Sequence, residues 1–156
     1  MNILYVCTHN RCRSIICETV TNKLGAGRLR AVSAGSEPAG EVHPLSLRYL
    51  AQAGYPTEGL RSQSWDDFEG EELDLVLTVC DSAAGESCPL WLGRNPKMHW
   101  GLVDPSRLEG SDAELEAAFM ATIAEVEGRV RALLDLPLEK LRGEELRFAL
   151  AGLGAA

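Results

Sequence analysis

The stretch Cys7–Ser14, which reads C-x5-R-S, constrains the fold of this 156-residue chain more than any other segment. The apolar run Ile3–Val6 precedes it and predicts a short strand, and a helical pattern follows it at once. The stretch is therefore expected to be a loop between the C-terminal end of a first strand and the N-terminus of a first helix. Such a junction is where α/β proteins bind anions, because the backbone N–H groups and the helix dipole both favour negative charge.

A thiol opens this loop and a guanidinium closes it. Arg13 can direct two N–H donors onto a tetrahedral oxyanion, and the positive surroundings are expected to lower the pKa of Cys7 and keep it as a thiolate nucleophile. Ser14 is expected to cap the helix and can also donate a hydrogen bond to the Cys7 sulfur. Asn10 can brace the loop through its amide or tolerate a left-handed backbone. The alternative is a cysteine that ends a buried strand beside an unrelated, exposed arginine.

The net charge of −8 argues against non-specific binding of nucleic acid and requires any positive field to be local to the loop. The first apolar run is too short for a signal peptide, and no stretch approaches the roughly 20 apolar residues of a membrane helix. We therefore expect one cytoplasmic domain with neither a nucleic-acid nor a membrane partner.

Five cysteines are present, at positions 7, 12, 17, 80 and 88. In a reducing compartment, cysteines take part in metal binding or thiol chemistry more often than in structural disulfides. No two of them form a C-x2-C pair, and the three histidines lack finger-like spacing, so no zinc site is predicted. Cys17 falls near an apolar helix face, which favours a buried, inert thiol.

Three further strands are expected, at residues 29–34, 73–79 and 97–100. The run 73–79 is almost continuously aliphatic, as in a strand buried on both faces of a parallel sheet. Helices are predicted to begin near Ser14, at His43-Pro44, and at the capping box Ser111–Glu114. The chain is thus predicted to be an α/β protein. His43 either faces the anion loop or is simply a polar residue at a helix start.

Cys80 ends a buried strand as Cys7 does, so both are expected at the same edge of a parallel sheet. If their strands are neighbours, about 4.8 Å apart, the two sulfurs can meet after a small loop movement. Cys80 can also pair with Cys88 if the intervening segment is a loop or a helix that unwinds. Eight helical residues span about 12 Å, whereas a disulfide needs Cα atoms within roughly 7 Å. The alternative is two incidental thiols.

Asp104-Pro105 follows the last predicted strand and would lie at the same edge, facing the anion loop. A carboxylic acid there can protonate a departing oxygen. By itself, Asp-Pro indicates only a turn.

The Cys7–Ser14 loop near the N-terminus, the Cys80/Cys88 pair and Asp104-Pro105 together resemble the low-molecular-weight protein tyrosine phosphatase family, which includes a branch of arsenate reductases. The resemblance covers roughly residues 2–135. It implies a four-stranded parallel sheet in the order 2-1-3-4 with helices on both faces. His9 departs from the pattern, since glycine is usual there, and its side chain is expected to narrow the pocket or change the turn. Ser106 stands where the phosphatases usually have tyrosine, which favours the reductase branch.

The resemblance also implies the roles of individual residues. The catalytic set would be Cys7, Arg13, Asp104, Cys80 and Cys88. The oxyanion would be bound by Thr8, His9, Asn10, Arg11, Cys12, Arg13 and Ser14. In the reductase branch, Asn10, Glu18 and Ser33 resemble positions that can bind a monovalent cation. No tightly bound cofactor is implied.

The function implied in this way is thiol-dependent reduction of arsenate to arsenite, through a Cys7 adduct and a disulfide relay via Cys80 and Cys88. Thioredoxin would supply the electrons. The spacing from Cys80 to Cys88 is slightly longer than in thioredoxin-coupled members, so glutathione with glutaredoxin is the other route. A phosphotyrosine phosphatase and a phosphocysteine carrier remain alternatives. Residues 1–137 would form the phosphatase-like arsenate reductase domain, and residues 138–156 a C-terminal helical extension or tail.

Overall fold

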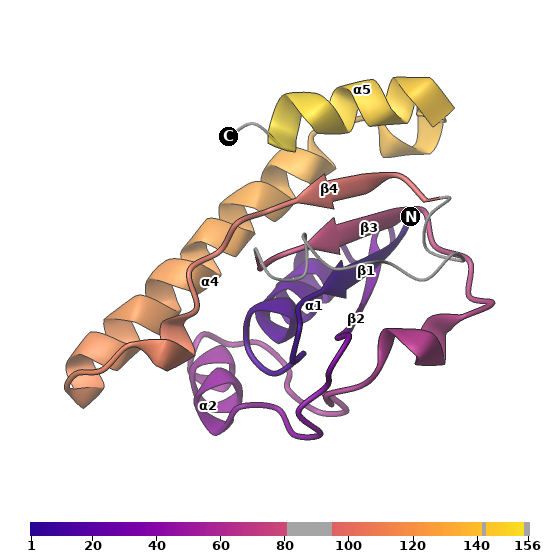
Figure 1. Ribbon diagram of the computed structural model, residues 1–156. Coiled ribbons are helices and arrows are strands. Elements are labelled where there is room, and N and C mark those ends of the chain that lie inside the picture. The colour runs from indigo at the N-terminus through magenta and orange to yellow at the C-terminus, as the bar shows by residue number, and fades with distance from the viewer. Residues whose placement is uncertain (81–94, 142, 155–156) are drawn as a thin grey trace.

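The computed structural model, which describes residues 1–80, 95–141 and 143–154, is built on a four-stranded parallel sheet (Figure 1). The strands are β1 (Asn2–Val6), β2 (Arg30–Ala34), β3 (Leu75–Thr78) and β4 (Lys97–His99), in the spatial order β2-β1-β3-β4. The predicted α/β class and the strand order 2-1-3-4 are confirmed. β1 and β3 lie in the middle of the sheet, which explains why their sequences are nearly continuous apolar runs.

The strand register decides which residues meet at the carboxyl edge of the sheet. Val6 is aligned with Ala34 on one side and with Thr78 on the other. The N–H of Val79 continues the ladder by donating to the Val6 carbonyl at 3.0 Å. Cys7 and Cys80 therefore leave two adjacent strands at the same edge.

The helices pack on this sheet and on each other. α1 (Arg13–Leu24) follows β1 and contacts both β2 and the long helix α4 (Asp112–Leu134), while α2 (Pro44–Gln52) packs against α1 and α4. The Ser111 hydroxyl caps α4 by accepting the Glu114 N–H at 3.3 Å, as the capping box predicts. A short 3-10 turn, η1 (Trp65–Phe68), lies between α2 and β3. In the core, the rings of Trp100 and Tyr5 pack against each other in a tilted arrangement, with ring centroids 5.8 Å apart.

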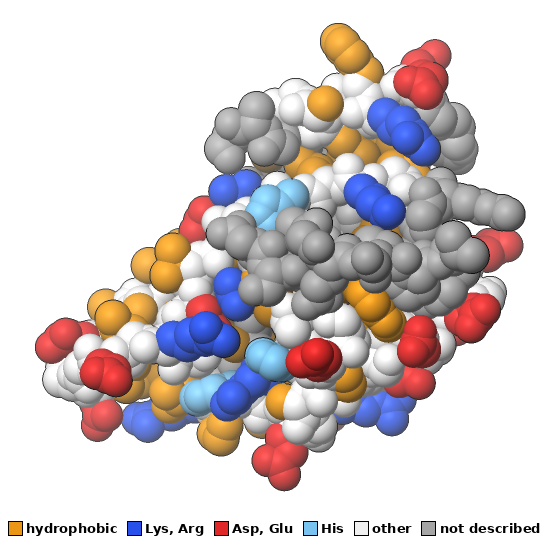
Figure 2. All heavy atoms as spheres, in the orientation of Figure 1, with side chains coloured by type: hydrophobic (Ala, Val, Ile, Leu, Met, Phe, Trp, Pro, Cys, Tyr) orange, Lys and Arg blue, Asp and Glu red, His pale blue; other side chains and the backbone are white. Residues whose placement is uncertain are grey.

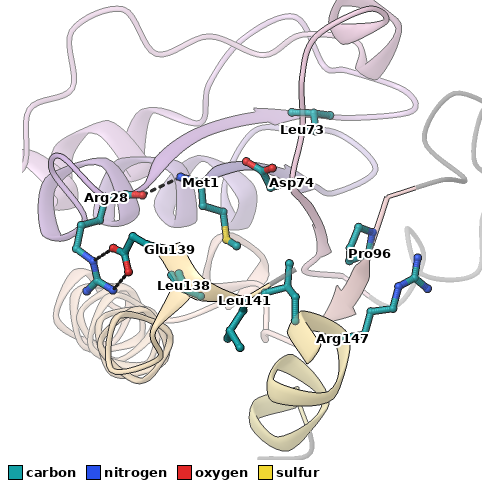
Figure 3. A pocket seen from close by; sticks show the side chains of 10 residues that line it. Met1, Arg28, Leu73, Asp74, Pro96, Leu138, Glu139, Leu141 and Arg147 are labelled. Atoms are coloured by element: carbon teal, nitrogen blue, oxygen red, sulfur yellow. Dashed lines mark hydrogen bonds and ion pairs between the residues drawn. The ribbon is translucent and has the colours of Figure 1, made fainter. Parts of the chain in front are cut away.

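The C-terminal part consists of η4 (Leu138–Lys140) and α5 (Gly143–Gly154), and α5 lies along β4 (Figure 1). Leu138, Leu146 and Leu150 are buried in the core. Arg28 holds the turn before α5 in place, because its guanidinium bonds the Glu139 carboxylate at 2.7 Å (Figure 3). It also donates to the Leu134 carbonyl at the end of α4, at 2.7 Å. The boundary at residue 137 stays a prediction.

A hollow of about 510 Å³ lies beside this turn, at the edge where the strands begin (Figure 3). It is on the opposite edge of the sheet from Cys7. Within the described part of the chain, no helix combines the length and the apolar character that a membrane span requires.

Candidate active site

The loop between β1 and α1 is held from outside by the segment that follows β2. The carbonyls of Thr8, His9 and Arg11 accept backbone N–H groups at 2.9 Å; the donors are Glu37, Ala39 and His43 respectively. At Gly35 a Cβ atom would lie 2.4 Å from the Thr8 carbonyl oxygen, so only glycine allows the two segments to approach this closely. The loop is thereby fixed in shape before any anion binds.

Asn10 supports the loop both through its left-handed backbone and through the hydrogen bonds of its side-chain amide. Its φ of 47° is left-handed, and its side chain is fully buried. The amide nitrogen donates to Ser14 Oγ at 2.8 Å and to Ser33 Oγ at 2.9 Å, and the amide oxygen accepts the Gln63 N–H at 2.8 Å. Asn10 therefore fixes the loop to α1, β2 and the segment before η1.

Ser14 does not cap the first helix. α1 begins at Arg13 with Cys12 at the N-cap position and no side-chain cap, so Ser14 is already inside the first turn. The prediction of a Ser14 cap is wrong because the buried Asn10 amide takes up the serine hydroxyl.

Glu18, Ser33 and Asn10 form one chain of hydrogen bonds. Ser33 accepts from Asn10 and donates to Glu18 Oε1 at 2.6 Å. Burial raises the pKa of Glu18, while the Ser33 hydrogen bond lowers it. The three residues suggested as a cation site thus lie together, and cation binding by them stays a prediction. In the described ranges no cluster of three or more His, Cys, Asp or Glu side chains could hold a metal ion.

A cavity of about 140 Å³ opens above the loop. Its lining residues are Cys7, His9, Arg11, Cys12, Arg13, His43, Asp104, Ser106 and Arg107. Three of these side chains are arginines and one is a carboxylate, so the site is positive although the chain carries a net charge of −8. Figure 2 shows basic and histidine side chains gathered side by side on this face, near α2.

Asp104 caps η3 (Pro105–Arg107) and faces the loop across the cavity. Its Oδ1 accepts the Ser106 N–H at 3.0 Å and the Ser106 hydroxyl at 2.6 Å. Its Oδ2 lies 3.6 Å from Arg13 Nη2 and 3.5 Å from Arg107 Nε. Arg13 also donates from Nη1 to the Leu102 carbonyl at 3.1 Å. The buried Nε of Arg13 has no partner in the described part of the chain. The acid and the guanidinium are thus held over the Cys7 thiol.

The Cys7 and Cys80 thiols are hydrogen-bonded to each other. The backbone N–H of Thr8 donates to Cys80 Sγ at 3.4 Å, which holds the second thiol against the start of the loop. The Cys80 hydrogen bond and burial raise the pKa of Cys7, while Arg13 and the N–H of His9 lower it. The expectation of a lowered pKa is wrong for this arrangement, because the loop alone does not reveal the neighbouring thiol. All four described cysteines, at positions 7, 12, 17 and 80, are reduced.

His43 is drawn into the site by its place at the start of α2. Its Nδ1 accepts the Leu45 N–H at 3.1 Å and so caps the helix, while its ring lines the cavity. Burial and the Arg11 charge lower the pKa of His43, which favours the neutral ring with its proton on Nε2. His43 therefore both starts a helix and faces the anion loop.

Of the residues expected to bind the oxyanion, His9, Arg11, Cys12 and Arg13 line the cavity. Asn10 bonds Ser14 and Ser33, and the Thr8 N–H bonds Cys80. Oxyanion binding by Thr8, Asn10 and Ser14 stays a prediction. His9 needs no left-handed backbone, and its ring bonds the Glu37 carbonyl. Burial raises the pKa of Cys12 to about 12. Cys88 lies outside the described residues.

Two lining residues, Ser106 and Arg107, were not predicted as site residues. The sequence signals for them are their place directly after Asp104-Pro105 and, for Ser106, its position where the phosphatases usually have tyrosine.

The sequence matches a known protein family over most of its length. The family model of the low molecular weight phosphotyrosine protein phosphatase matches residues 2–146. The chain belongs to this family. The matched range includes the Cys7–Ser14 loop and Asp104-Pro105, two of the features that resemble this family.

Relatives within the family include proteins that reduce arsenate. An arsenate reductase of Halalkalibacterium halodurans is 31% identical over 133 residues, covering 85% of this chain and 94% of that protein. A glutaredoxin arsenate reductase of Synechocystis is 28% identical over 132 residues, covering 85% and 95%.

Solved structures agree with this fold. An arsenate reductase in its phosphate-binding state has a TM-score of 0.67 and 27% identity, covering 85% of this chain and 95% of its own. The thioredoxin-dependent arsenate reductase of Corynebacterium glutamicum has a TM-score of 0.63 and 29% identity, covering 85% and 59%.

Proposed function

We propose that the protein reduces arsenate to arsenite, with the thiols of Cys7 and Cys80 as the two-electron donor. The observation that carries the proposal is the hydrogen bond between these thiols, because Cys7 lines the oxyanion cavity and Cys80 lies directly beside it. A phosphatase or a phosphocysteine carrier needs one nucleophilic thiol, whereas reduction needs a second thiol within reach. The arsenate reductases among the relatives support this choice.

Binding uses the loop and its arginine. Arsenate is a tetrahedral anion, and the loop at the N-terminus of α1 offers backbone N–H groups and the helix dipole. Arg13 would turn from the Leu102 carbonyl and Asp104 toward two of the arsenate oxygens. A related arsenate reductase that binds phosphate supports this mode of binding.

The first chemical step forms a sulfur–arsenic bond. The Cys7 thiol gives up its proton to solvent and its sulfur attacks arsenic, one arsenic–oxygen bond breaks, and Asp104 gives its own proton to the departing oxygen, which leaves as water. Arg13 and the loop amides stabilise the charge on the remaining oxygens.

The second step transfers the electrons. Cys80 loses its proton and attacks the Cys7 sulfur. The sulfur–arsenic bond breaks, its electron pair stays on arsenic, and arsenite leaves behind a Cys7–Cys80 disulfide. Cys88 then attacks Cys80, which frees Cys7 and moves the disulfide to Cys80–Cys88.

An external dithiol restores the reduced enzyme. Thioredoxin, or glutathione with glutaredoxin, would reduce the final disulfide, and relatives of both kinds support an external thiol reductant. Free thiols at the site fit a reducing compartment, so the proposal includes a cytoplasmic location.

The test compares arsenite production by three proteins, each supplied with arsenate and either reductant system. The wild type should produce arsenite continuously, and Cys80→Ser should produce none while still hydrolysing p-nitrophenyl phosphate. The control Cys17→Ala removes a buried thiol that lies outside the cavity lining, and it should behave as the wild type does. Arsenate reduction by Cys80→Ser at the wild-type rate would contradict the proposal.

A phosphotyrosine phosphatase is the second candidate, and the family match favours it. It would use Cys7, Arg13 and Asp104 in the same positions and leave Cys80 unused. Ester hydrolysis without arsenate-dependent oxidation of the thiols would identify it.

A further inference from the structure

Arg107 occupies an unusual place at the mouth of the oxyanion cavity. Its side chain is 73% exposed, yet it lines the same cavity as Cys7 and Arg13. Its Nε lies 3.5 Å from Asp104 Oδ2, within the short turn η3. One end of this arginine thus touches the candidate acid, and the rest faces solvent.

Asp104 does not depend on Arg107 for its position. Both donors of Ser106 bond its Oδ1, and Arg13 approaches the same Oδ2 at 3.6 Å. An exposed ion pair contributes little stability, because water screens it and two side chains must be ordered. The contact between Arg107 and Asp104 is therefore easily exchanged for a contact with a stronger anion.

We propose that Arg107 leaves Asp104 when an oxyanion enters and pairs with its outward oxygen, so that it selects unesterified tetrahedral oxyanions. This inference rests on the proposed function and names the residue that sets substrate class at that site. A free arsenate or phosphate has a charged oxygen at the mouth of the cavity, where a guanidinium can bind it.

The size of the cavity explains the selection. At about 140 Å³ it accommodates a tetrahedral anion, and the organic group of an ester must project through the mouth. That group replaces the charged outward oxygen and occupies the space into which Arg107 would swing. An ester therefore gains nothing from Arg107.

The exchange also prepares Asp104 for its task. Once Arg107 has moved and Arg13 has turned to the bound anion, Asp104 Oδ2 is released from both guanidinium groups. Asp104 can then approach the departing oxygen as the proposed acid.

The test measures binding without requiring reduction. Arsenate, phosphate or phenyl phosphate protects Cys7 of the full-length protein against iodoacetamide, and the protection curve gives a dissociation constant for each. Arg107→Met should weaken arsenate and phosphate about tenfold, the size expected for a charge-assisted hydrogen bond. The dissociation constant for phenyl phosphate should change less than about twofold. For arsenate and phosphate, the dissociation constants of Arg107→Lys should fall between those of Arg107→Met and the wild type, because lysine keeps the charge but lacks the paired N–H donors of the guanidinium.

The matched control is Arg131→Met, an exposed arginine near the end of α4 and outside the cavity lining, which should leave all three constants unchanged. Equal weakening of all three ligands by Arg107→Met, or no weakening of arsenate, would overturn the role of Arg107 while leaving the proposed function intact. Absence of protection in the wild type would overturn both.

Discussion

The sulfur of Cys80 lies 3.4 Å from the backbone nitrogen of Thr8 and accepts its hydrogen bond. This contact joins the end of β3 to the first residue of the anion loop after Cys7. It holds the Cys80 thiol beside Cys7 while both are reduced. The proposed attack of Cys80 on Cys7 therefore starts from a preformed pair.

The first prediction concerns the acidity of Cys7. Because the hydrogen bond that the Cys7 thiol donates to Cys80 is the largest cause raising the pKa of Cys7, Cys80→Ala should lower that pKa. The rate of Cys7 alkylation as a function of pH, followed by peptide mass spectrometry, measures it. The alkylation midpoint should move to lower pH in Cys80→Ala and stay in place in Cys17→Ala. A midpoint that stays in place or rises in Cys80→Ala would show that the two thiols do not interact.

The second prediction concerns the acid. Asp104→Asn should slow formation of the sulfur–arsenic adduct by about 10² or more in single-turnover experiments, because the proton donor is lost. Binding should not weaken, since Arg13 and Arg107 lose a competing carboxylate. Asp135→Asn, an exposed site at the end of α4, is the control. An unchanged adduct rate would reduce Asp104 to a capping residue of η3.

The third prediction separates the two roles of Asn10. Asn10→Ala should destabilise the protein by about 3 kcal/mol, because it leaves buried hydrogen-bond partners unpaired and places alanine in a left-handed conformation. Asn10→Gly should cost about 1 kcal/mol less, since glycine tolerates that backbone. Urea denaturation of the wild type and the two variants measures the free energies of unfolding. Equal losses in Asn10→Ala and Asn10→Gly would show that the positive φ at this position costs no stability.

The fourth prediction follows from the buried Glu18. Its pKa is raised in the folded protein, so the native state holds the proton more tightly than the unfolded state does. Stability should therefore fall as pH rises from the ordinary glutamate pKa, about 4.3, through the raised value. Glu18→Gln should be more stable than the wild type at neutral pH, with the difference vanishing at acidic pH. The difference between the two denaturation curves across pH tests this sign.

The same variant tests the suggested cation site. A cation bound only by the native state stabilises it by mass action. Potassium chloride should raise the midpoint of wild-type unfolding relative to choline chloride at equal ionic strength, and the effect should disappear in Glu18→Gln. An identical response of both proteins would exclude Glu18 as a ligand.

The central strands of the sheet could be predicted because their residues form short, nearly continuous apolar runs. The aliphatic runs in β1 and β3 indicate strands buried on both faces, and their ends place Cys7 and Cys80 at one sheet edge. The sheet order came from the family resemblance, since the runs themselves do not say which strands are neighbours.

Features set by tertiary contacts could not be predicted. Arg107 lies at the cavity because η3 turns it back toward Asp104. Asp104-Pro105 indicates a turn, but the sequence does not show which of the following side chains the turn brings to the cavity. The pKa of Cys7 was predicted in the wrong direction because its largest cause comes from a residue 73 positions away in the chain. The sequence suggests Ser14 as a helix cap because it does not show the buried Asn10 amide, which bonds the Ser14 hydroxyl in the folded protein.

One measurement tests the central claim most directly. Reduced Cys88→Ser protein is treated with one equivalent of arsenate without external reductant, and its disulfides are mapped by mass spectrometry. The proposed mechanism predicts one arsenite per protein and a disulfide between Cys7 and Cys80, because the inner pair forms and no third thiol resolves it. Arsenite release without this disulfide, or a disulfide between Cys7 and any other cysteine, would contradict the mechanism.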